Sequence, residues 1–385
     1  MRVLCLTHNF PRHAGDPVGS FVLRLAVALG EQGIEVQVVA PSAPEVPASD
    51  VIEGIPVTRF RYAPRKLETL AYTGTMSNQV RHFWKARLAM VGFLAAGYRA
   101  ATRVMARTPV DVMHAHWWFP GGLVARAVRA RTGVPYVVTM HGSDIRLARA
   151  AGAATVFRSV SGRAAAMTTV SGWLARETRL LDPASAPVVA PMPVVADLFH
   201  PGGVRATNRL LFIGKLTEQK GLHHLLRALA LMRSGPMVDV VGAGRVDDAH
   251  LRVLATELGV AHRVTWHPLL SQAELAALYR AASVHVIPAV DEGLGMTAIE
   301  SLLSETPVVA FDSGGLPDIV IPDRTGLLVP VGDVTALAAA VDRVLTDGGL
   351  RERLGHAGRQ FALTRFGPRQ VAEQYASILR AAARR

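Results

Sequence analysis

Two carboxylates, Glu292 and Glu300, stand eight positions apart in the chain and enclose two glycines. The apolar runs at residues 282–288 and 307–311 predict buried strands before and after this segment. The segment is therefore expected to form a strand-to-helix turn at the carboxyl end of a parallel sheet, which is where open α/β sheets bind ligands. Glycine lets backbone amides approach a ligand closely, and the start of a helix favours a polar or anionic group.

Carboxylates on both sides of such a turn can accept hydrogen bonds from vicinal hydroxyl groups. The segment therefore suits a ligand that joins many hydroxyls to an anionic group, as a nucleotide sugar does. The simpler interpretation is that acidic residues beside a glycine turn only cap a helix. The spacing of Glu292 and Glu300, taken alone, does not decide between the two.

A second pair of charged residues, Lys215 and Lys220, flanks a loop that follows the apolar run at 209–213 and opens a predicted helix. Two cations at a helix start could bind a diphosphate. The alternative is a solvated loop with two surface lysines. The chain has only four lysines, and two of them stand in this loop directly before Gly221, which favours the diphosphate site.

Length and composition favour a soluble protein with two domains. The chain has 385 residues, half of them hydrophobic, and is too long for one ordinary core. Its apolar stretches, such as residues 88–98, are shorter than a membrane span. The opening run predicts a strand rather than a secretion signal, and the single cysteine, Cys5, cannot form an internal disulfide. We therefore expect a cytoplasmic protein.

Strand and helix patterns alternate along the chain, which predicts parallel sheets with helices on both faces. A stretch rich in proline and glycine interrupts the alternation in the middle. We therefore predict a first α/β domain at 1–190, a linker at 191–208, a second α/β domain at 209–366, and a C-terminal helix at 367–385 that could cross back to the first domain. The predicted strands are 2–7, 35–40, 110–114, 134–140, 166–170, 209–213, 237–241, 262–267 and 284–287, and the predicted helices are 21–31, 221–232, 272–281, 335–347, 350–362 and 368–383.

These segments, taken in order, resemble the family 4 glycosyltransferases. That family retains the anomeric configuration of the sugar and has the GT-B fold, in which two Rossmann-like parallel-sheet domains face a cleft. Each matching segment is weak alone, but their joint order is distinctive and spans nearly the whole chain. The matching segments are 7–11 with Gly15 and Gly19, 111–116, 139–144, 169–171, 214–216, 220–221, 241–244, 291–300, 307–309, 314–317 and 325–328.

The resemblance implies a role for each matching residue. Glu300 would hold the ribose hydroxyls of a nucleotide, and Glu292 would lie beside the donor sugar. The two lysines would bind the diphosphate, which the amide of Gly19 would reach from the first domain. His116 would touch the transferred sugar. The implied catalytic residues are His116, Glu292, Lys215 and Lys220; the donor-binding residues are Gly19, Lys215, Lys220, Glu292, Gly293, Leu294, Gly295, Met296 and Glu300; and the acceptor contacts are His141 and Asp144.

The resemblance also implies a nucleoside diphosphate sugar as substrate, and neither a metal nor another cofactor. Among such donors we expect a UDP-sugar first and GDP-mannose as the alternative. His114 and His116 share one face of a predicted strand and could bind a metal, but no third ligand is evident. The chain departs from the family pattern in two places. Lys215 replaces the usual arginine, which removes a bidentate fork. Residues 192–195 read Met-Pro-Val-Val where the family often has Gly followed by Val-Asp.

Positive charge is concentrated in one part of the chain. Residues 59–131 contain 13 lysines and arginines against two acids, Glu68 and Asp111, a net of +11 compared with +12 for the whole chain. Within this segment, apolar residues alternate with arginine and lysine between residues 81 and 107. They are Phe83, Trp84, Leu88, Val91 and Leu94.

Three interpretations of this segment stay open. It suits a helix on an anionic membrane surface, a groove for an anionic glycan or lipid-linked acceptor, or an ordinary amphipathic helix with solvated arginines.

Two alternatives to a transferase also stay open. One is a sugar-nucleotide epimerase of the same fold, which needs no acceptor. The other is a basic nucleic-acid-binding protein, but the chain lacks a recognition-helix module or a basic motif interleaved with aromatics, so no nucleic acid is expected as partner.

Overall fold

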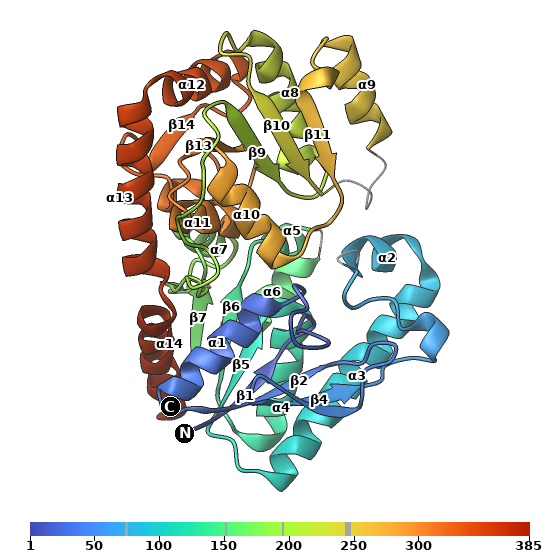
Figure 1. The fold of residues 1–385 in the computed structure, drawn as a ribbon. Helices are drawn as coiled ribbons and strands as arrows, with labels where there is room; N and C mark the ends of the chain where they lie inside the picture. Colours follow the sequence, from blue (N-terminus) through green and yellow to red (C-terminus); the bar gives the residue numbers. More distant parts are fainter. Residues whose placement is uncertain (74–75, 151, 195, 243–247) are drawn as a thin grey trace. The chain divides into compact units, whose positions relative to one another are not determined.

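The computed structural model describes residues 1–73, 76–150, 152–194, 196–242 and 248–385 (Figure 1). They form two compact units, one of Met1–Pro193 with Pro368–Arg385 and one of Val194–Gly367. The division falls inside the segment predicted as a linker. Each unit is an α/β structure on a mostly parallel sheet, which confirms the predicted fold class. Val195 of the linker motif, and residues 243–244 of the predicted glycine motif at 241–244, lie outside the described residues.

The first unit is built on an eight-stranded sheet. Its strands are β1 (Arg2–Leu6), β2 (Glu35–Pro41), β3 (Ser49–Ile52), β4 (Ile55–Phe60), β5 (Val112–His116), β6 (Tyr136–Met140), β7 (Ala166–Thr169) and β8 (Val188–Val189). They lie in the order β3-β4-β2-β1-β5-β6-β7-β8, and all neighbours are parallel except the antiparallel pair β3 and β4. Strands β5 and β6 are buried along their whole length, as expected for parallel strands covered on both faces.

Helices pack on the first sheet in two groups (Figure 1). They are α1 (Ser20–Glu31), α2 (Met76–His82), α3 (Trp84–Arg107), α4 (Leu123–Thr132), α5 (Ser143–Ala148), α6 (Ala153–Ser161), α7 (Gly172–Leu181) and the C-terminal α14 (Pro368–Ala383). Helix α1 packs against α14, and α3 packs against α4. The two pairs lie on opposite faces, because right-handed crossovers run from β1 to β2 in one direction and from β5 to β6 in the other.

The second unit is built on a six-stranded sheet in which all neighbours are parallel. Its strands are β9 (Arg209–Ile213), β10 (Met237–Val241), β11 (Val264–His267), β12 (Val284–Ile287), β13 (Val308–Phe311) and β14 (Gly326–Val329), in the order β11-β10-β9-β12-β13-β14. Its helices are α8 (Leu222–Leu231), α9 (Ala249–Glu257), α10 (Gln272–Ala281), α11 (Met296–Leu303), α12 (Val334–Thr346) and α13 (Gly348–Phe366). Helices α8, α9 and α12 pack together, as do α10, α11 and α13.

Both sheets have a point at which the order of the strands reverses. It lies between β1 and β5 in the first sheet and between β9 and β12 in the second. The loops that leave these neighbouring strands diverge to opposite sides of the sheet, which leaves a crevice at the carboxyl ends of the strands where α/β proteins bind ligands. The predicted site segments that contain Gly19, Lys215 with Lys220, and Glu292 all follow these strands.

The observed elements differ from the predicted ones at two places that matter for the argument. Strand β5 extends to His116 rather than ending at residue 114, because its ladder with β6 continues to the pair His116 and Thr139. The hairpin of β3 and β4 was not predicted. Its turn contains Glu53 and Gly54, both with positive φ angles of 47° and 81°, and glutamate is not a residue that signals such a turn.

Candidate active site

The loops that follow β9 and β12 are joined at the switch point of the second sheet. The carbonyl of Gln219 accepts a hydrogen bond from the Val290 amide at 2.9 Å, and the side-chain amide of Gln219 donates to the carbonyl of Asp291 at 3.1 Å. The ammonium group of Lys220 forms an ion pair with the carboxylate of Glu292. Two predicted site residues that are 72 positions apart are therefore in direct contact.

Glycines allow these loops to pack backbone against backbone. Gly221 has a φ angle of 73°, and a Cβ atom at this position would lie 1.9 Å from the carbonyl oxygen of Pro288. Gly314 has a φ angle of 60°, and its Cβ would lie 2.5 Å from the amide nitrogen of Glu292. The amide of Gly315 donates to the carbonyl oxygen of Glu292 at 2.7 Å. Any side chain at Gly221 or Gly314 would push the loops apart and displace the ion pair.

The predicted donor-binding segment 293–296 lies at the start of α11. Gly295 precedes the helix with a φ angle of 95°, which an L-residue rarely adopts. Leu294 and Gly295 are buried, whereas Gly293 and Met296 are half-buried. The first amides of a helix have no intrahelical acceptors and carry the positive end of the helix dipole, so this segment is suited to an anionic or strongly polar group.

Glu300 lies one turn into α11 and is half-buried. Its carboxylate accepts a hydrogen bond from the hydroxyl of Tyr279 on α10 at 2.9 Å. Burial raises the pKa of Glu300 to about 7, and the hydrogen bond from Tyr279 opposes that rise because it stabilises the ionised form. Tyr279 is itself fully buried, with its ring edge-on to Phe199 and to His285. The carboxylate is therefore held by a residue whose own position is fixed by packing.

Lys215 lies in the same loop as Lys220, directly after β9, and is exposed. The stem of Lys220 runs across Gly214, since its Cγ would lie 3.4 Å from a Cβ added there. The two lysines thus occupy the two ends of one loop, as the sequence predicts, with Lys220 held against Glu292 and Lys215 at the surface.

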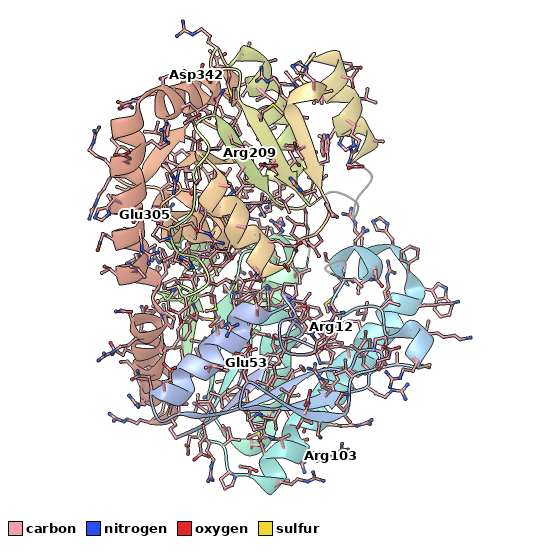
Figure 2. All side chains as sticks on the ribbon, in the orientation of Figure 1. Arg12, Glu53, Arg103, Arg209, Glu305 and Asp342 are labelled. Carbon is pink, nitrogen blue, oxygen red and sulfur yellow. The ribbon has the colours of Figure 1, made fainter. Side chains whose placement is uncertain are left out.

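The loop after β1 in the first unit is held in a fixed shape. Arg12 (labelled in Figure 2) makes a bidentate ion pair with Asp16, with distances of 2.6 and 3.1 Å. Burial alone would raise the pKa of Asp16, but hydrogen bonds from Arg12 and from the Val18 amide lower it to about 2. Gly19 ends the loop with a φ angle of 72°, and a Cβ there would lie 2.5 Å from the carbonyl oxygen of Asn9. The predicted Gly19 therefore lies where α1 begins and where only glycine fits.

Four rings pack together at the switch point of the first sheet. His116 is only 1% exposed, and its Nδ1 lies 3.0 Å from Nε2 of His141. Trp117 packs against His141 and His8 with ring centroids 4.4 and 4.3 Å apart. Burial lowers the pKa of His116 and of His141 well below the usual value, and neighbouring histidines add to the effect. The pair is therefore neutral, with one ring donating a hydrogen bond to the other.

Asp144 lies beside this cluster but does not face solvent. Its carboxylate accepts hydrogen bonds from the amides of Gly142 at 2.9 Å and of His141 at 3.2 Å. Burial raises its pKa to about 6, which these hydrogen bonds oppose. Asp144 thus fixes the turn that carries His141, whereas His141 is half-buried and is the member of the predicted acceptor pair with surface exposed.

No group of three or more His, Cys, Asp and Glu side chains among the described residues is placed to hold a metal ion. The two histidines of β5 have other partners. Nε2 of His114 lies 2.7 Å from the Thr139 hydroxyl, and His116 is paired with His141.

Comparison with known proteins shows the family. Residues 202–361 match the model of the group 1 glycosyl transferases, and residues 18–194 match the glycosyl transferase 4-like domain. A D-inositol 3-phosphate glycosyltransferase from Streptomyces scabiei is 30% identical over 401 aligned residues, which cover 92% of this chain and 85% of that protein. The chain belongs to the family 4-type glycosyltransferases.

Solved structures agree with this assignment at the level of the fold. A sucrose-phosphate synthase from Thermosynechococcus elongatus superposes with a TM-score of 0.81 and 23% identity, covering 99% of this chain and 98% of that one. HepE from Anabaena, solved in complex with UDP, superposes with a TM-score of 0.75 and 17% identity, covering 99% of this chain and all of that one. The two sheets are thus those of a GT-B glycosyltransferase, an enzyme of the hexosyltransferase type.

The structure of this glycosyltransferase also reveals residues that the sequence did not. Tyr279 reaches Glu300 from another helix, and Gln219 joins the two loops. Trp117, next to the predicted His116, adopts a positive φ angle of 63° and fills the histidine cluster. Gln219 stands directly before Lys220, so the motif could have drawn attention to it. No local pattern marks Tyr279, because its role depends on a contact between α10 and α11.

Proposed function

We propose that this glycosyltransferase moves a sugar from a nucleoside diphosphate sugar to a glycan, a lipid-linked acceptor or a small-molecule acceptor, with retention of anomeric configuration. A UDP-sugar is the favoured donor, and GDP-mannose is the alternative. The observation that carries the proposal is the contact between Lys220 and Glu292 at the switch point, four residues before the helix that carries Glu300. A cation for phosphate and two carboxylates for hydroxyls match the two chemical parts of such a donor.

The second unit supplies the groups for the donor. Glu300 is proposed to accept hydrogen bonds from the ribose hydroxyls, with Tyr279 holding its carboxylate. Glu292 is proposed to face the donor sugar, and its pairing with Lys220 keeps both side chains in place before the donor binds. Lys215 and Lys220, with the amides at the start of α11, are proposed to bind the diphosphate. The UDP in the HepE complex, a protein of the same fold, supports a uridine nucleotide.

The first unit is proposed to supply the acceptor side. His116 and His141 form a neutral, hydrogen-bonded pair at its switch point, and the amide of Gly19 stands at the start of α1. A neutral imidazole can accept a hydrogen bond from a sugar hydroxyl or donate one, but it does not place a charge beside the anomeric carbon. Within this pair His141 has the exposed surface, so His116 is proposed to act together with it.

The proposed reaction breaks the bond between the anomeric carbon and the phosphate oxygen and forms a bond from that carbon to the acceptor oxygen. The acceptor attacks on the face from which the nucleotide leaves, and a phosphate oxygen takes the acceptor proton. Negative charge develops on the leaving diphosphate, where Lys215, Lys220 and the amides at the start of α11 stabilise it. These groups supply the charge compensation that a metal would otherwise give, so the reaction is proposed to need no cofactor. The buried Cys5 fits a reducing cytoplasmic setting.

A screen of nucleotide sugars tests the proposal. The purified chain is incubated with each donor and a panel of acceptors, nucleotide release is measured, and products are identified by mass and by the anomeric configuration in NMR spectra. Transfer of a hexose with its configuration retained is the expected result. A donor that is epimerised or hydrolysed without any acceptor would instead identify an epimerase of this fold. Salt-sensitive shifts of random DNA, without sugar transfer, would identify a nucleic-acid-binding protein.

A further inference from the structure

The helix α3 exposes large apolar side chains at its N-terminal end. Phe83 precedes the helix and is 61% exposed, while Trp84, Leu88 and Val91 are 65%, 62% and 66% exposed. In a helix, positions 84, 88 and 91 lie on one face, because each step of three or four residues is about one turn. Side chains of this size are ordinarily buried, and a group of them on one face marks an interaction surface.

An apolar hollow adjoins this end of α3. It has a volume of about 290 Å³ and lies between the segment 62–67 and the first turns of the helix. Leu67, Trp84 and Leu88 contribute to its lining, together with Lys85. The ammonium group of Lys85 lies 5.8 Å from the centroid of the Trp84 ring. The surface therefore combines an apolar depression with a cation at its rim.

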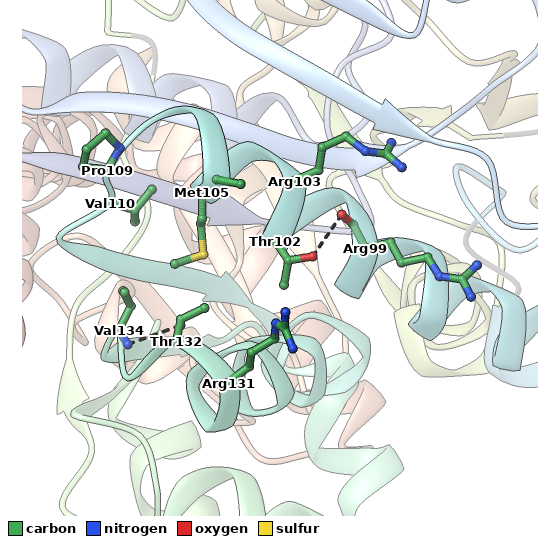
Figure 3. A pocket seen from close by; sticks show the side chains of 10 residues that line it. Arg99, Thr102, Arg103, Met105, Pro109, Val110, Arg131, Thr132 and Val134 are labelled. Carbon is green, nitrogen blue, oxygen red and sulfur yellow. Dashed lines mark hydrogen bonds between the residues drawn. The ribbon is translucent and has the colours of Figure 1, made fainter.

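The same face of α3 becomes basic toward its C-terminal end. Positions 95, 99, 103 and 106 continue the line of exposed residues, and two of them, Arg99 and Arg103, are basic. Arg99 and Arg103, with Arg131 at the end of α4, surround an open groove of about 690 Å³ (Figure 3). Apolar side chains complete the groove, namely Met105, Pro109, Val110 and Val134. The exposed face of this helix is thus apolar for one half and basic for the other, over a length of about 36 Å.

The acids of this part of the chain do not neutralise these arginines. Glu68 is buried and accepts hydrogen bonds from the Ser42 hydroxyl and the Tyr62 amide, and Asp111 accepts one from the Arg2 amide. The ion pairs found among the described residues include none of the arginines of the groove. The positive charge of Arg99, Arg103 and Arg131 therefore faces solvent on this surface.

We infer that the outward face of α3 docks the protein on an anionic phospholipid bilayer. Phe83, Trp84, Leu88 and Val91 enter the interface between headgroups and acyl chains, and the arginines of the groove bind phosphate groups of the lipids. A helix with large apolar side chains, including an aromatic ring, and flanking arginines suits this position in the membrane interface. No helix among the described residues is long and apolar enough to cross a bilayer, so the contact is with one leaflet. The inference does not depend on the sugar-transfer site.

Co-sedimentation of the full chain with vesicles tests the inference. The vesicles contain phosphatidylcholine alone or an equal mixture with phosphatidylglycerol, at low and at high salt. Binding is expected only with phosphatidylglycerol, and it is expected to weaken at high salt because headgroup charge is screened. Each basic residue near such a surface contributes about fivefold to binding, so reversing all three arginines of the groove to glutamate is expected to weaken it at least 10²-fold.

Matched variants distinguish the effect of this face from the effects of net charge and of exposed apolar side chains elsewhere. Arg176, Arg179 and Arg353 are exposed on α7 and α13, and their change to glutamate alters net charge equally. This control is expected to weaken binding far less than the reversal of Arg99, Arg103 and Arg131. A second comparison uses two double variants. Trp84→Ser combined with Leu88→Ser removes apolar side chains from α3, whereas Leu180→Ser combined with Leu269→Ser removes two that are 75% and 56% exposed elsewhere.

Insertion of Trp84 into the bilayer can be measured separately from binding. Brominated lipids quench tryptophan fluorescence on contact, and the quenching is expected to disappear in Trp84→Phe while vesicle binding stays within a few-fold of wild type. Equal binding to the two kinds of vesicle, or equal losses in the α3 variants and their controls, would overturn the inference. Binding of a soluble polyanionic glycan to this face, with no binding to phosphatidylglycerol, would also overturn it and would assign the arginines to an anionic acceptor.

Discussion

Replacing Tyr279 with phenylalanine tests whether Glu300 is the ionised carboxylate that binds the donor nucleotide. The substitution removes one hydroxyl from a fully buried side chain and leaves its ring against Phe199 and His285. The lost hydrogen bond, 2.9 Å long, is one that stabilises ionised Glu300. His285, which packs against Tyr279, stays neutral between pH 6 and pH 9 because burial lowers its pKa to about 3. Its charge therefore does not change in the titrations described below.

The magnitude follows from the pKa of Glu300, which is about 7. A hydrogen bond to a charged group contributes about 1.5–3 kcal/mol, and one pKa unit corresponds to about 1.4 kcal/mol, so Tyr279→Phe is expected to raise the pKa of Glu300 by about 1–2 units. At pH 7 the ionised fraction then falls from about one half to about one tenth or one hundredth. If only the ionised form binds the ribose hydroxyls, affinity falls about 5- to 50-fold at pH 7 and recovers toward pH 9.

The assay is calorimetric titration of UDP at pH 6, 7, 8 and 9 against the wild type and Tyr279→Phe. Tyr375→Phe is the matched control, because Tyr375 is also fully buried and donates its hydroxyl to the Ala190 carbonyl at 2.9 Å, within the first unit. The affinity of Tyr375→Phe for UDP is expected to equal that of the wild type at every pH. Because UDP titrates identically in all three experiments, differences between the proteins do not arise from UDP itself. Wild-type affinity and an unshifted pH midpoint in Tyr279→Phe would refute the reasoning.

Further substitutions probe the remaining groups. Lys220→Ala is expected to lower kcat/KM about 10²-fold or more, because it removes stabilisation of developing phosphate charge, and near-normal turnover would show that the diphosphate lies elsewhere. Lys215→Arg is expected to retain or improve turnover in the same assay, since the family favours arginine there. His116→Ala is expected to abolish most transfer while calorimetry shows unchanged UDP affinity; lost affinity in a folded variant would relocate His116. The raised pKa of Glu300 means that the folded state favours its neutral form, so stability present below about pH 4.5 is lost as pH rises through 7. In urea titrations at pH 8, the free energy of unfolding of Glu300→Gln is therefore expected to be about 1–3 kcal/mol higher than that of the wild type. At pH 4.5 the two free energies of unfolding are expected to be equal.

The parts of the fold that could be predicted are those with local signals. Residues 272–281 and 368–383 show helical periodicity and carry clear boundaries, and α10 and α14 coincide with them. The turn at 291–300 could be placed at the sheet edge because its glycines follow a buried run. The contact of Lys220 with Glu292 then follows from strand order, since β9 and β12 are neighbours only in the folded sheet.

The parts that could not be predicted depend on contacts distant in sequence or on unusual backbone. The bond from Tyr279 to Glu300 requires two helices to pack, and neither residue alone signals it. Asp144 could be matched to a motif, but its type does not reveal that local amides would occupy its carboxylate. Likewise, the periodicity of α3 shows that Trp84 and Leu88 share a face but not whether that face is covered; the structure leaves it exposed.

The central claim is that Glu300 and the switch point of the second sheet bind a nucleoside diphosphate. Calorimetric affinity for UDP and for GDP, measured for the wild type, Glu300→Ala and the control Glu352→Ala, tests it most directly. Glu352 is exposed on α13, so its loss removes the same charge away from the site. The account predicts that the wild type binds one of the two nucleotides, that Glu300→Ala weakens this binding about 10- to 150-fold, and that Glu352→Ala leaves it unchanged. Wild-type affinity in Glu300→Ala, or no binding of either nucleotide by the wild type, would contradict it.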